Sequence, residues 1–185
     1  MFQTKYKNRN IIAISDTHGR HKDLGVLPDS DVLIHCGDAC SDGDLGQLKD
    51  FFAWFVSQPA KRKIFVAGNH DLIFDLDPDK AMTLVPKQVI FFENKISVID
   101  GIVFASFAAR PWMHEVPIKT ASNIDFLLTH GPALNVLDNG LGCSKLRNFL
   151  NGFRPKYHLF GHVHSEGQKQ MIVKDVICYN CCNFI

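Results

Sequence analysis

The chain has 185 residues, of which 46% are hydrophobic and 21% are charged, and its formal net charge is +1. These values are typical of a globular domain that buries its own core, so we expect residues 1–185 to form one domain. A nearly neutral chain argues against a main role in binding nucleic acid. No apolar run reaches the length that crosses a membrane, so we expect no membrane partner.

The cysteines are interpreted as reduced thiols. Residues 1–10 are polar and basic and lack the apolar segment of a secretory signal, which predicts a cytoplasmic location. The cysteine cluster near residue 180 raises a zinc site as an alternative, but such sites take ligands from two separated pairs. We favour the interpretation that the cysteines of this cluster are small buried residues on the last strand. The six are Cys36, Cys40, Cys143, Cys178, Cys181 and Cys182.

The first regular element is expected at residues 11–18, after a frayed lead-in over residues 1–10. The apolar run Ile-Ile-Ala-Ile predicts a buried strand. Because side chains alternate along a strand, Asp16 and His18 are expected to project to one side at its C-terminal end, with Thr17 on the other. An Asp-x-His ending is by itself a weak signal, since a solvated turn explains such a pair more often than a metal site does.

The same pattern of an apolar strand followed by polar residues then recurs twice. Residues 31–38 end in Gly-Asp, and the strand at 64–67 leads into Gly-Asn-His-Asp at 68–71. Between them, Ser-x-x-Asp and leucines and phenylalanines at helical spacing predict a helix from Ser41 to about Gln58. At most a short helix is expected near residues 21–24. These strand–helix units predict a parallel sheet with the polar groups at one edge.

The second half is expected to begin with antiparallel strands. Asp100-Gly101 is a strong signal for a type I′ turn, and residues 107–118 lack periodicity, which predicts a long loop. In that loop Arg110, Trp112 and His114 could hold a phosphate or stack on a base, but stabilising a surface loop explains them equally well. The other predicted elements are helices near Asp79–Leu84 and Ser144–Leu150 and strands at Val89–Phe92, Ile96–Ile99, Ile102–Ser106, Asp125–His130, Tyr157–Phe160, Met171–Val173 and Val176–Asn180.

Side chains that commonly bind metals gather at the ends of these strands. They are imidazoles, carboxylates and one amide without a thiolate, a set that suits Mn, Fe, Zn or a similar ion and disfavours a structural cysteine site. Seven ligands are too many for one ion and suit two ions that share a bridging carboxylate. The set is Asp16, His18, Asp38, Asn69, His130, His162 and His164. Three histidines outside it, His21, His35 and His158, are expected in the core or at the surface.

The polar blocks occur in a fixed order: Asp-x-His, Gly-Asp, Gly-Asn-His-Asp, His-Gly and Gly-His-x-His. With them the sequence resembles the calcineurin-like metallophosphoesterase superfamily, and especially its small cyclic-nucleotide phosphodiesterase branch, related to the metallophosphoesterase-domain proteins of animals. It departs from the Ser/Thr protein phosphatases, because Ser41 and Asp42 stand where their Asp and Arg would be. The resemblance implies an α/β fold: a β-sandwich of mixed sheets flanked by helices, with a βαβαβ half that carries the first metal ligands.

The resemblance also implies roles for individual residues. His70 would be the catalytic histidine that protonates the leaving group, and Asp71 would orient it. Two divalent ions, with Mn expected and Fe, Zn, Ni or Co also compatible, would lie about 3.5–4 Å apart and hold a bridging hydroxide that attacks phosphorus. By the same resemblance Asp16, His18 and His164 would bind one ion, Asn69, His130 and His162 the other, and Asp38 both.

The expected function is therefore a dinuclear metal-dependent phosphodiesterase that acts on a small phosphoester substrate such as a cyclic nucleotide. Two alternatives stay open. One is a scaffold that binds a partner, as the retromer subunit of this fold does. The other is a DNA nuclease of the same superfamily, which the nearly neutral charge disfavours. The sequence leaves the oligomeric state open.

Overall fold

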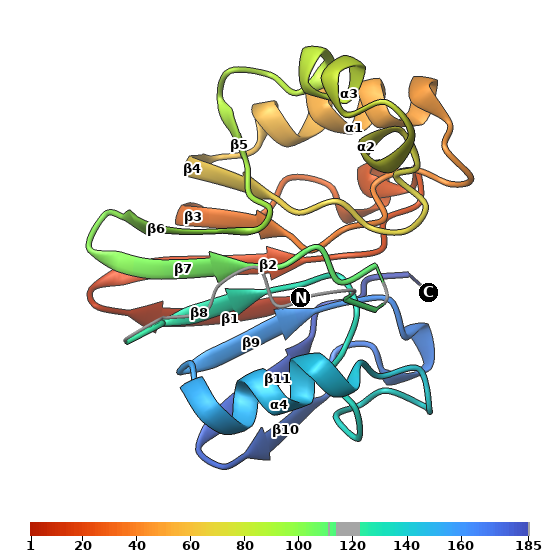
Figure 1. Cartoon of the computed structure of the whole chain (residues 1–185). Helices are drawn as coiled ribbons and strands as arrows, with labels where there is room; N and C mark the ends of the chain where they lie inside the picture. Colours follow the sequence, from red (N-terminus) through yellow and green to blue (C-terminus); the bar gives the residue numbers. More distant parts are fainter. Residues whose placement is uncertain (111, 114–122, 185) are drawn as a thin grey trace.

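The structure is a computed structural model that describes residues 1–110, 112–113 and 123–184. Two β-sheets pack face to face, with α1, α2 and α3 on one outer side and α4 on the other (Figure 1). The predicted class, an α/β sandwich of mixed sheets flanked by helices, is confirmed. Among the described residues, no helix combines the length and the apolar character needed to cross a bilayer.

The first sheet has the strand order β1-β2-β3-β4-β5, and β2 to β5 run parallel. Its strands are β1 (Phe2–Tyr6), β2 (Arg9–Ile14), β3 (Ser30–His35), β4 (Ala60–Phe65) and β5 (Val89–Phe91). They are connected by η1 (His21–Leu24), α1 (Leu45–Ser57), α2 (Ile73–Leu76) and α3 (Pro78–Leu84). The carboxyl ends of β2, β3 and β4 therefore meet at one edge.

The prediction of a frayed lead-in over residues 1–10 is wrong. β1 pairs antiparallel with β2, and Lys7 and Asn8 form the turn between them with positive φ. Phe2 is buried and its ring packs 5.7 Å from that of Tyr157 on the opposite sheet. The alternation of Phe2, Thr4 and Tyr6 is a strand signal, which the neighbouring lysines obscured.

The second sheet has the strand order β10-β11-β9-β8-β7-β6. Its elements are β6 (Lys95–Ile99), β7 (Ile102–Ser106), β8 (Phe126–Leu128), β9 (Tyr157–Phe160), β10 (Gln170–Val173) and β11 (Val176–Asn180), with α4 (Ser144–Phe153) and the short η2 (His164–Glu166). The two predicted hairpins are confirmed, and Asp100 and Gly101 both have the positive φ that a type I′ turn requires.

Three apolar layers hold the sandwich together. One fills the space between the sheets, one lies between the first sheet and α1, and one lies between the second sheet and α4. In the layer under α1, the predicted stripe of Phe51, Phe52 and Phe55 is buried. Truncating one such phenylalanine to alanine typically costs about 3–5 kcal/mol of stability. These layers fix the sheet edges at which the polar groups lie.

Helix α1 begins three residues later than the predicted capping box places it. Asp44, not Ser41, is the N-cap, and its carboxylate accepts hydrogen bonds from the backbone N–H groups of Gly46 and Gln47. Asp42 has a positive φ, so the chain turns between Ser41 and the helix. An aspartate beside two exposed N–H groups satisfies donors that the first helical turn leaves open.

The predicted loop at residues 107–118 falls partly outside the described residues, because 111 and 114–122, including His114, lie there. Within the described part, Arg110 is nearly buried and forms ion pairs with Glu93 and Asp75. Of the two roles considered for Arg110, binding a phosphate or base and stabilising the loop, the structure supports the stabilising one, because the guanidinium is paired with two carboxylates. Trp112 is exposed.

The histidines expected outside the cluster, His21, His35 and His158, are all buried. His158 lies 2.9 Å from Thr129 Oγ1 through its Nε2, whereas its Nδ1 has no hydrogen-bond partner. Because the Thr129 hydroxyl donates to the carbonyl of Gly131, the ring donates from Nε2 and stays neutral. Burial lowers the pKa of His158 to about 3.

We expect His158 to destabilise the fold in acid. The unfolded chain takes up a proton near pH 6.5 and the folded chain does not, so this group's contribution is complete above pH 6.5 and falls as the pH drops towards 3. Between pH 7 and pH 5 the loss is about 2 kcal/mol. Urea unfolding of metal-free His158→Phe should show a correspondingly smaller drop than wild type, and an unchanged drop would contradict the assignment.

Candidate metal centre

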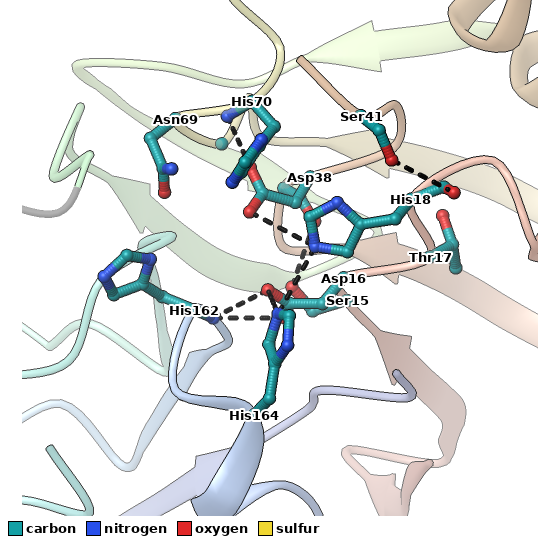
Figure 2. Close-up of polar contacts among 12 residues, drawn as sticks. Ser15, Asp16, Thr17, His18, Asp38, Ser41, Asn69, His70, His162 and His164 are labelled. Carbon is teal, nitrogen blue, oxygen red and sulfur yellow. Dashed lines mark hydrogen bonds and ion pairs between the residues drawn. The ribbon is translucent and has the colours of Figure 1, made fainter. Parts of the chain in front are cut away.

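The seven predicted ligands come together where strands of both sheets end. Figure 2 shows Asp16, His18, Asp38 and His164 pointing toward one another, with His162 beside them. One group of ligands follows β2, β3 and β4 in the first sheet, and the other follows β8 and β9 in the second. The first group is Asp16, His18, Asp38 and Asn69, and the second is His130, His162 and His164.

The turn after β2 differs from the prediction in its backbone. The strand ends at Ile14, and Asp16 and His18 have φ values of 57° and 42°. The N–H of Asp16 donates to the carbonyl of Gly37, and that of His18 to the carbonyl of Asp38. The two side chains therefore reach the site through a left-handed turn and not through strand alternation. Thr17 points away as expected, with Oγ1 3.1 Å from His35 Nε2.

Left-handed backbone recurs at one ligand after β3 and at one after β9. Asp38 has a φ of 58° and His162 a φ of 69°. Such a conformation costs a non-glycine residue about 1–2 kcal/mol. Residues that store strain of this kind cluster at functional sites, because the surrounding fold holds them in place.

Two glycines let the carboxylates approach the backbone. A Cβ atom on Gly161 would lie 2.1 Å from Asp16 Oδ2, and one on Gly68 would lie 2.1 Å from Asp38 Oδ1. The N–H of His162 donates to both oxygens of Asp16, at 3.0 and 3.1 Å. Gly68 and Gly161, each of which precedes a polar block, are therefore needed for close packing.

In one half of the cluster, His18 and His164 face two carboxylates. His18 Nε2 lies 3.3 Å from His164 Nε2 and 3.6 Å from Asp38 Oδ2, and His164 Nε2 lies 3.5 Å from Asp16 Oδ1. The hydrogen bond to Asp16 raises the pKa of His164 against the effect of burial. Nitrogen and carboxylate donors that converge so closely form a set that a divalent cation fits.

In the other half, His130 lies between Asp38 and Asn69. Its Nε2 is 3.2 Å from Asp38 Oδ2 and 2.9 Å from Asn69 Oδ1, and its Nδ1 is 2.8 Å from the carbonyl oxygen of Cys36. Nδ1 therefore donates to that carbonyl, which turns Nε2 towards the cluster. Burial opposes charge on this ring, but the nearby Asp38 carboxylate raises the pKa of His130 to about 9. The His162 ring lies 5.2 Å away.

Asp38 occupies the centre of the cluster. Its Oδ2 faces His18 on one side and His130 on the other, and its Oδ1 accepts a hydrogen bond from the backbone N–H of His70. Burial opposes the charged form, but the His130 ring and that hydrogen bond hold the pKa of Asp38 below its usual range. The carboxylate belongs both to a group with His18 and His70 and to one with His130 and His162. This position between two donor groups suits a bridging ligand.

His70 lies at the open side of the cluster, and its side chain is 38% exposed. Its ring is 4.9 Å from the His18 ring, and its Nδ1 is 3.2 Å from Asp42 Oδ1. No sequence motif indicates this contact, because Asp42 lies 28 residues away from His70 in a turn.

The expectation that Asp71 orients the His70 ring needs correction. Its buried carboxylate accepts hydrogen bonds from the backbone N–H groups of Asp38, Ala39, Cys40 and Gly68. Burial and the nearby Asp38 raise the pKa of Asp71 to about 6. Asp71 therefore fixes the turn that presents Asp38, since its carboxylate accepts hydrogen bonds from four backbone N–H groups and from the Cys40 thiol.

Two residues near the end of the described chain also reach the cluster. The Phe184 ring lies 5.2 Å from the His18 ring and 4.7 Å from the His164 ring. Cys182 is close to Asp16 and His164. The sequence pattern places neither of them at this cluster, because a backbone bridge between Ser15 and Cys182 brings them here.

A family model described as calcineurin-like phosphoesterase matches residues 9–166. The chain therefore belongs to the calcineurin-like phosphoesterase family, and the superfamily resemblance drawn from the polar blocks is confirmed. This family uses divalent metal ions, in agreement with the donors that the structure brings together.

Among individual proteins, the chain is 29% identical to human metallophosphoesterase domain-containing protein 1, over 83% of this chain and 60% of that protein. It is 31% identical to UPF0046 protein C25E10.12 of Caenorhabditis elegans, over 90% and 71%. It is also 31% identical to the probable rhamnogalacturonate lyase C of Emericella nidulans, over 93% of this chain but 18% of that protein. The chain thus spans only part of the length of these relatives.

A solved structure, that of TT1561 of Thermus thermophilus, superposes with a TM-score of 0.66. The alignment covers 93% of this chain and 88% of that one, at 13% identity. At this identity the likeness concerns the fold, and it agrees with the two-sheet architecture described above.

Proposed function

We propose that this chain is a dinuclear metal-dependent phosphoesterase that hydrolyses small phosphodiesters such as cyclic nucleotides. The observation that carries the proposal is the convergence of six nitrogen- and oxygen-donating residues from both sheets around the central carboxylate of Asp38. Family membership supports hydrolysis of a phosphoester bond. The all-thiol state of the six cysteines supports a cytoplasmic location.

The proposed centre has two positions that share Asp38. One would be formed by Asp16, His18 and His164, and the other by Asn69, His130 and His162. When bound, two divalent ions would supply Lewis-acid polarisation of the phosphoryl oxygens and a nucleophile at neutral pH. Mn²⁺ is the first ion to test.

The protein's own contribution to bond cleavage is a proton. The ester oxygen that leaves phosphorus needs protonation, and His70 is the partly exposed histidine beside the donor cluster. Asp42 engages Nδ1 of His70, which leaves Nε2 to hold the transferable proton. Asp42 thus positions the ring, while Asp71 holds the backbone turn beneath it.

Phe184 supports a substrate with an aromatic group. Its ring is 40% exposed beside the rings of His18 and His164, and the guanidinium carbon of Arg20 lies 5.8 Å from its centroid. A cavity of about 110 Å³ lies against it, lined in part by Thr17, Arg20 and Asn183. An aromatic face next to a cation suits a nucleobase or a phenyl ester.

The decisive experiment is metal removal followed by reconstitution. We expect chelator-treated protein to lose hydrolysis of bis(4-nitrophenyl) phosphate and cyclic nucleotides, and added Mn²⁺ to restore it with two ions bound per chain. His70→Ala should lower kcat at least about 100-fold with both ions retained, because general acid catalysis typically contributes this much. Protein that binds two ions yet hydrolyses no monoester, diester or cyclic nucleotide with any of Mn, Fe, Zn, Ni or Co would refute the proposal.

Phe184→Ala tests the substrate class. We expect KM for an aromatic diester to rise about tenfold, since one stacking contact is worth about 1–3 kcal/mol. KM for a dialkyl phosphate should stay unchanged. Phe153→Ala, a change on α4 in the other half of the molecule, is the matched control. Equal effects of Phe184→Ala on both substrates would contradict a stacking role.

The same measurements separate the two alternative functions. A chain that binds no divalent metal would be a scaffold of this fold. A DNA nuclease would cleave DNA and bind it with a strong dependence on salt. The nearly neutral charge favours a small substrate over DNA.

A further inference from the structure

Cys182 is held beside the metal ligands by the backbone that follows β11. Its N–H donates to Oδ1 of Asn180 at 2.9 Å, and the next residue, Asn183, donates its N–H to the carbonyl of Ser15. Asn180 is anchored in turn, because its Nδ2 donates to the carbonyl of Val163 at 2.8 Å. Cys182 is only 2% exposed. Hydrogen bonds of the backbone therefore fix the position of the thiol.

The thiol completes a donor group with two of the proposed ligands. Cys182 Sγ, a carboxylate oxygen of Asp16 and a ring nitrogen of His164 all lie within 4.8 Å of one another. Metal–sulfur bonds are about 2.3 Å long, and bonds to imidazole nitrogen or carboxylate oxygen about 2.0–2.2 Å. Donors on opposite sides of one ion are thus about 4.0–4.5 Å apart, so small adjustments place all three on a single ion.

We propose that Cys182 is a further ligand of the ion held by Asp16, His18 and His164, and that it makes this position select a thiophilic ion such as Zn²⁺ or Co²⁺ over Mn²⁺. On binding, the thiol proton passes to solvent and the thiolate forms the bond to the ion. The inference rests on the proposed metal centre and refines it. Asn69, His130 and His162 supply only nitrogen and oxygen, so the two positions would differ in preference.

The competing role for Cys182 is that of a hydrogen-bond donor to Asp16. A protonated thiol beside a carboxylate would orient that carboxylate and would leave ion selectivity unchanged. A bond from sulfur to the ion and a hydrogen bond from sulfur to oxygen differ in their spectra, and this difference can be measured without any substrate.

The test is cobalt absorption spectroscopy on the full chain. Metal-free protein is titrated with Co²⁺, and the visible bands report occupancy of the centre, whereas a sulfur-to-cobalt charge-transfer band in the ultraviolet reports a thiolate ligand. We expect the charge-transfer band in wild type and in the control Cys178→Ala, which removes a buried thiol within the layer under α4. We expect the visible bands without the charge-transfer band in Cys182→Ser.

A second measurement is the affinity for each ion. Cys182→Ser should weaken Zn²⁺ binding at one position about tenfold or more and leave Mn²⁺ binding within a factor of about two. Wild-type protein that binds Co²⁺ without the charge-transfer band, or a band that persists in Cys182→Ser, would overturn the assignment while the metal centre stands. Protein that binds no cobalt would overturn both, and a wild-type spectrum without the charge-transfer band overturns the assignment even if the variant does not fold.

Discussion

Replacing Asp38 with asparagine is expected to lower kcat for diester hydrolysis about a thousandfold or more. Asp38 is the one predicted ligand whose carboxylate faces both halves of the cluster, so its charge would serve two ions at once. Losing several kcal/mol of electrostatic stabilisation corresponds to this factor, since each 1.36 kcal/mol is tenfold in rate. Steady-state kinetics with Mn²⁺, together with metal analysis, gives the measurement.

Asp44→Asn is the matched control for Asp38→Asn. Asp44 caps α1, and asparagine caps helices as well as aspartate does, so this variant should keep full activity. We expect Asp38→Asn to hold fewer than two ions per chain, because its amide is a weaker bridge. Two bound ions and more than about a tenth of the wild-type rate would show that the centre does not depend on a bridging carboxylate.

Replacing Asp71 with alanine is expected to destabilise the fold by about 4 kcal/mol or more. The substitution leaves four backbone N–H groups without the acceptor that they share in a fully buried position. Each unsatisfied buried group costs about 1–3 kcal/mol, and water entering the space recovers part of it. Urea unfolding of the metal-free protein measures the effect.

Two further variants test whether the loss of stability comes from the Asp71 carboxylate: the conservative change Asp71→Asn and the control Asp79→Ala. The asparagine keeps one acceptor oxygen and should lose less stability than alanine does. Asp79 is exposed in the first turn of α3, and its replacement should change the stability by no more than about 0.5 kcal/mol. If Asp71→Ala and Asp79→Ala unfold at the same urea concentration, the backbone turn does not depend on Asp71.

The parts of the fold that the sequence predicts are those with a local signal. The apolar run Tyr157–Phe160 matches β9 from end to end. Asp100-Gly101 marks the hairpin of β6 and β7, because few turns accept two residues with positive φ. The block Gly-His-x-His places His162 and His164 at one strand end. The sequence does not predict β1, because its alternation is carried by three residues among lysines. It misplaces the start of α1, because two capping residues, Ser41 and Asp44, compete within four residues.

The parts of the site that the sequence does not reveal depend on contacts between distant segments. Asp42 reaches His70 across a turn, and Cys182 lies beside Asp16 although 166 positions separate them in the chain. Motifs defined by the spacing of nearby residues cannot predict contacts between such distant pairs. Strand alternation predicts the position of the His18 side chain correctly but not its cause, since a left-handed turn and not the pleat directs the side chain.

The division of the ligands between the two sheets has a mechanical consequence. Asp16, His18, Asp38 and Asn69 follow strands of the first sheet, whereas His130, His162 and His164 follow strands of the second. Any ion that they share would cross-link the two sheets at the edge of the sandwich. Separating the sheets would then require breaking coordination bonds as well as exposing apolar surface. Amide protons in β3 of the first sheet and β9 of the second should then exchange with solvent more slowly as metal is added. The metal centre would thus stabilise the fold against separation of the sheets as well as support catalysis.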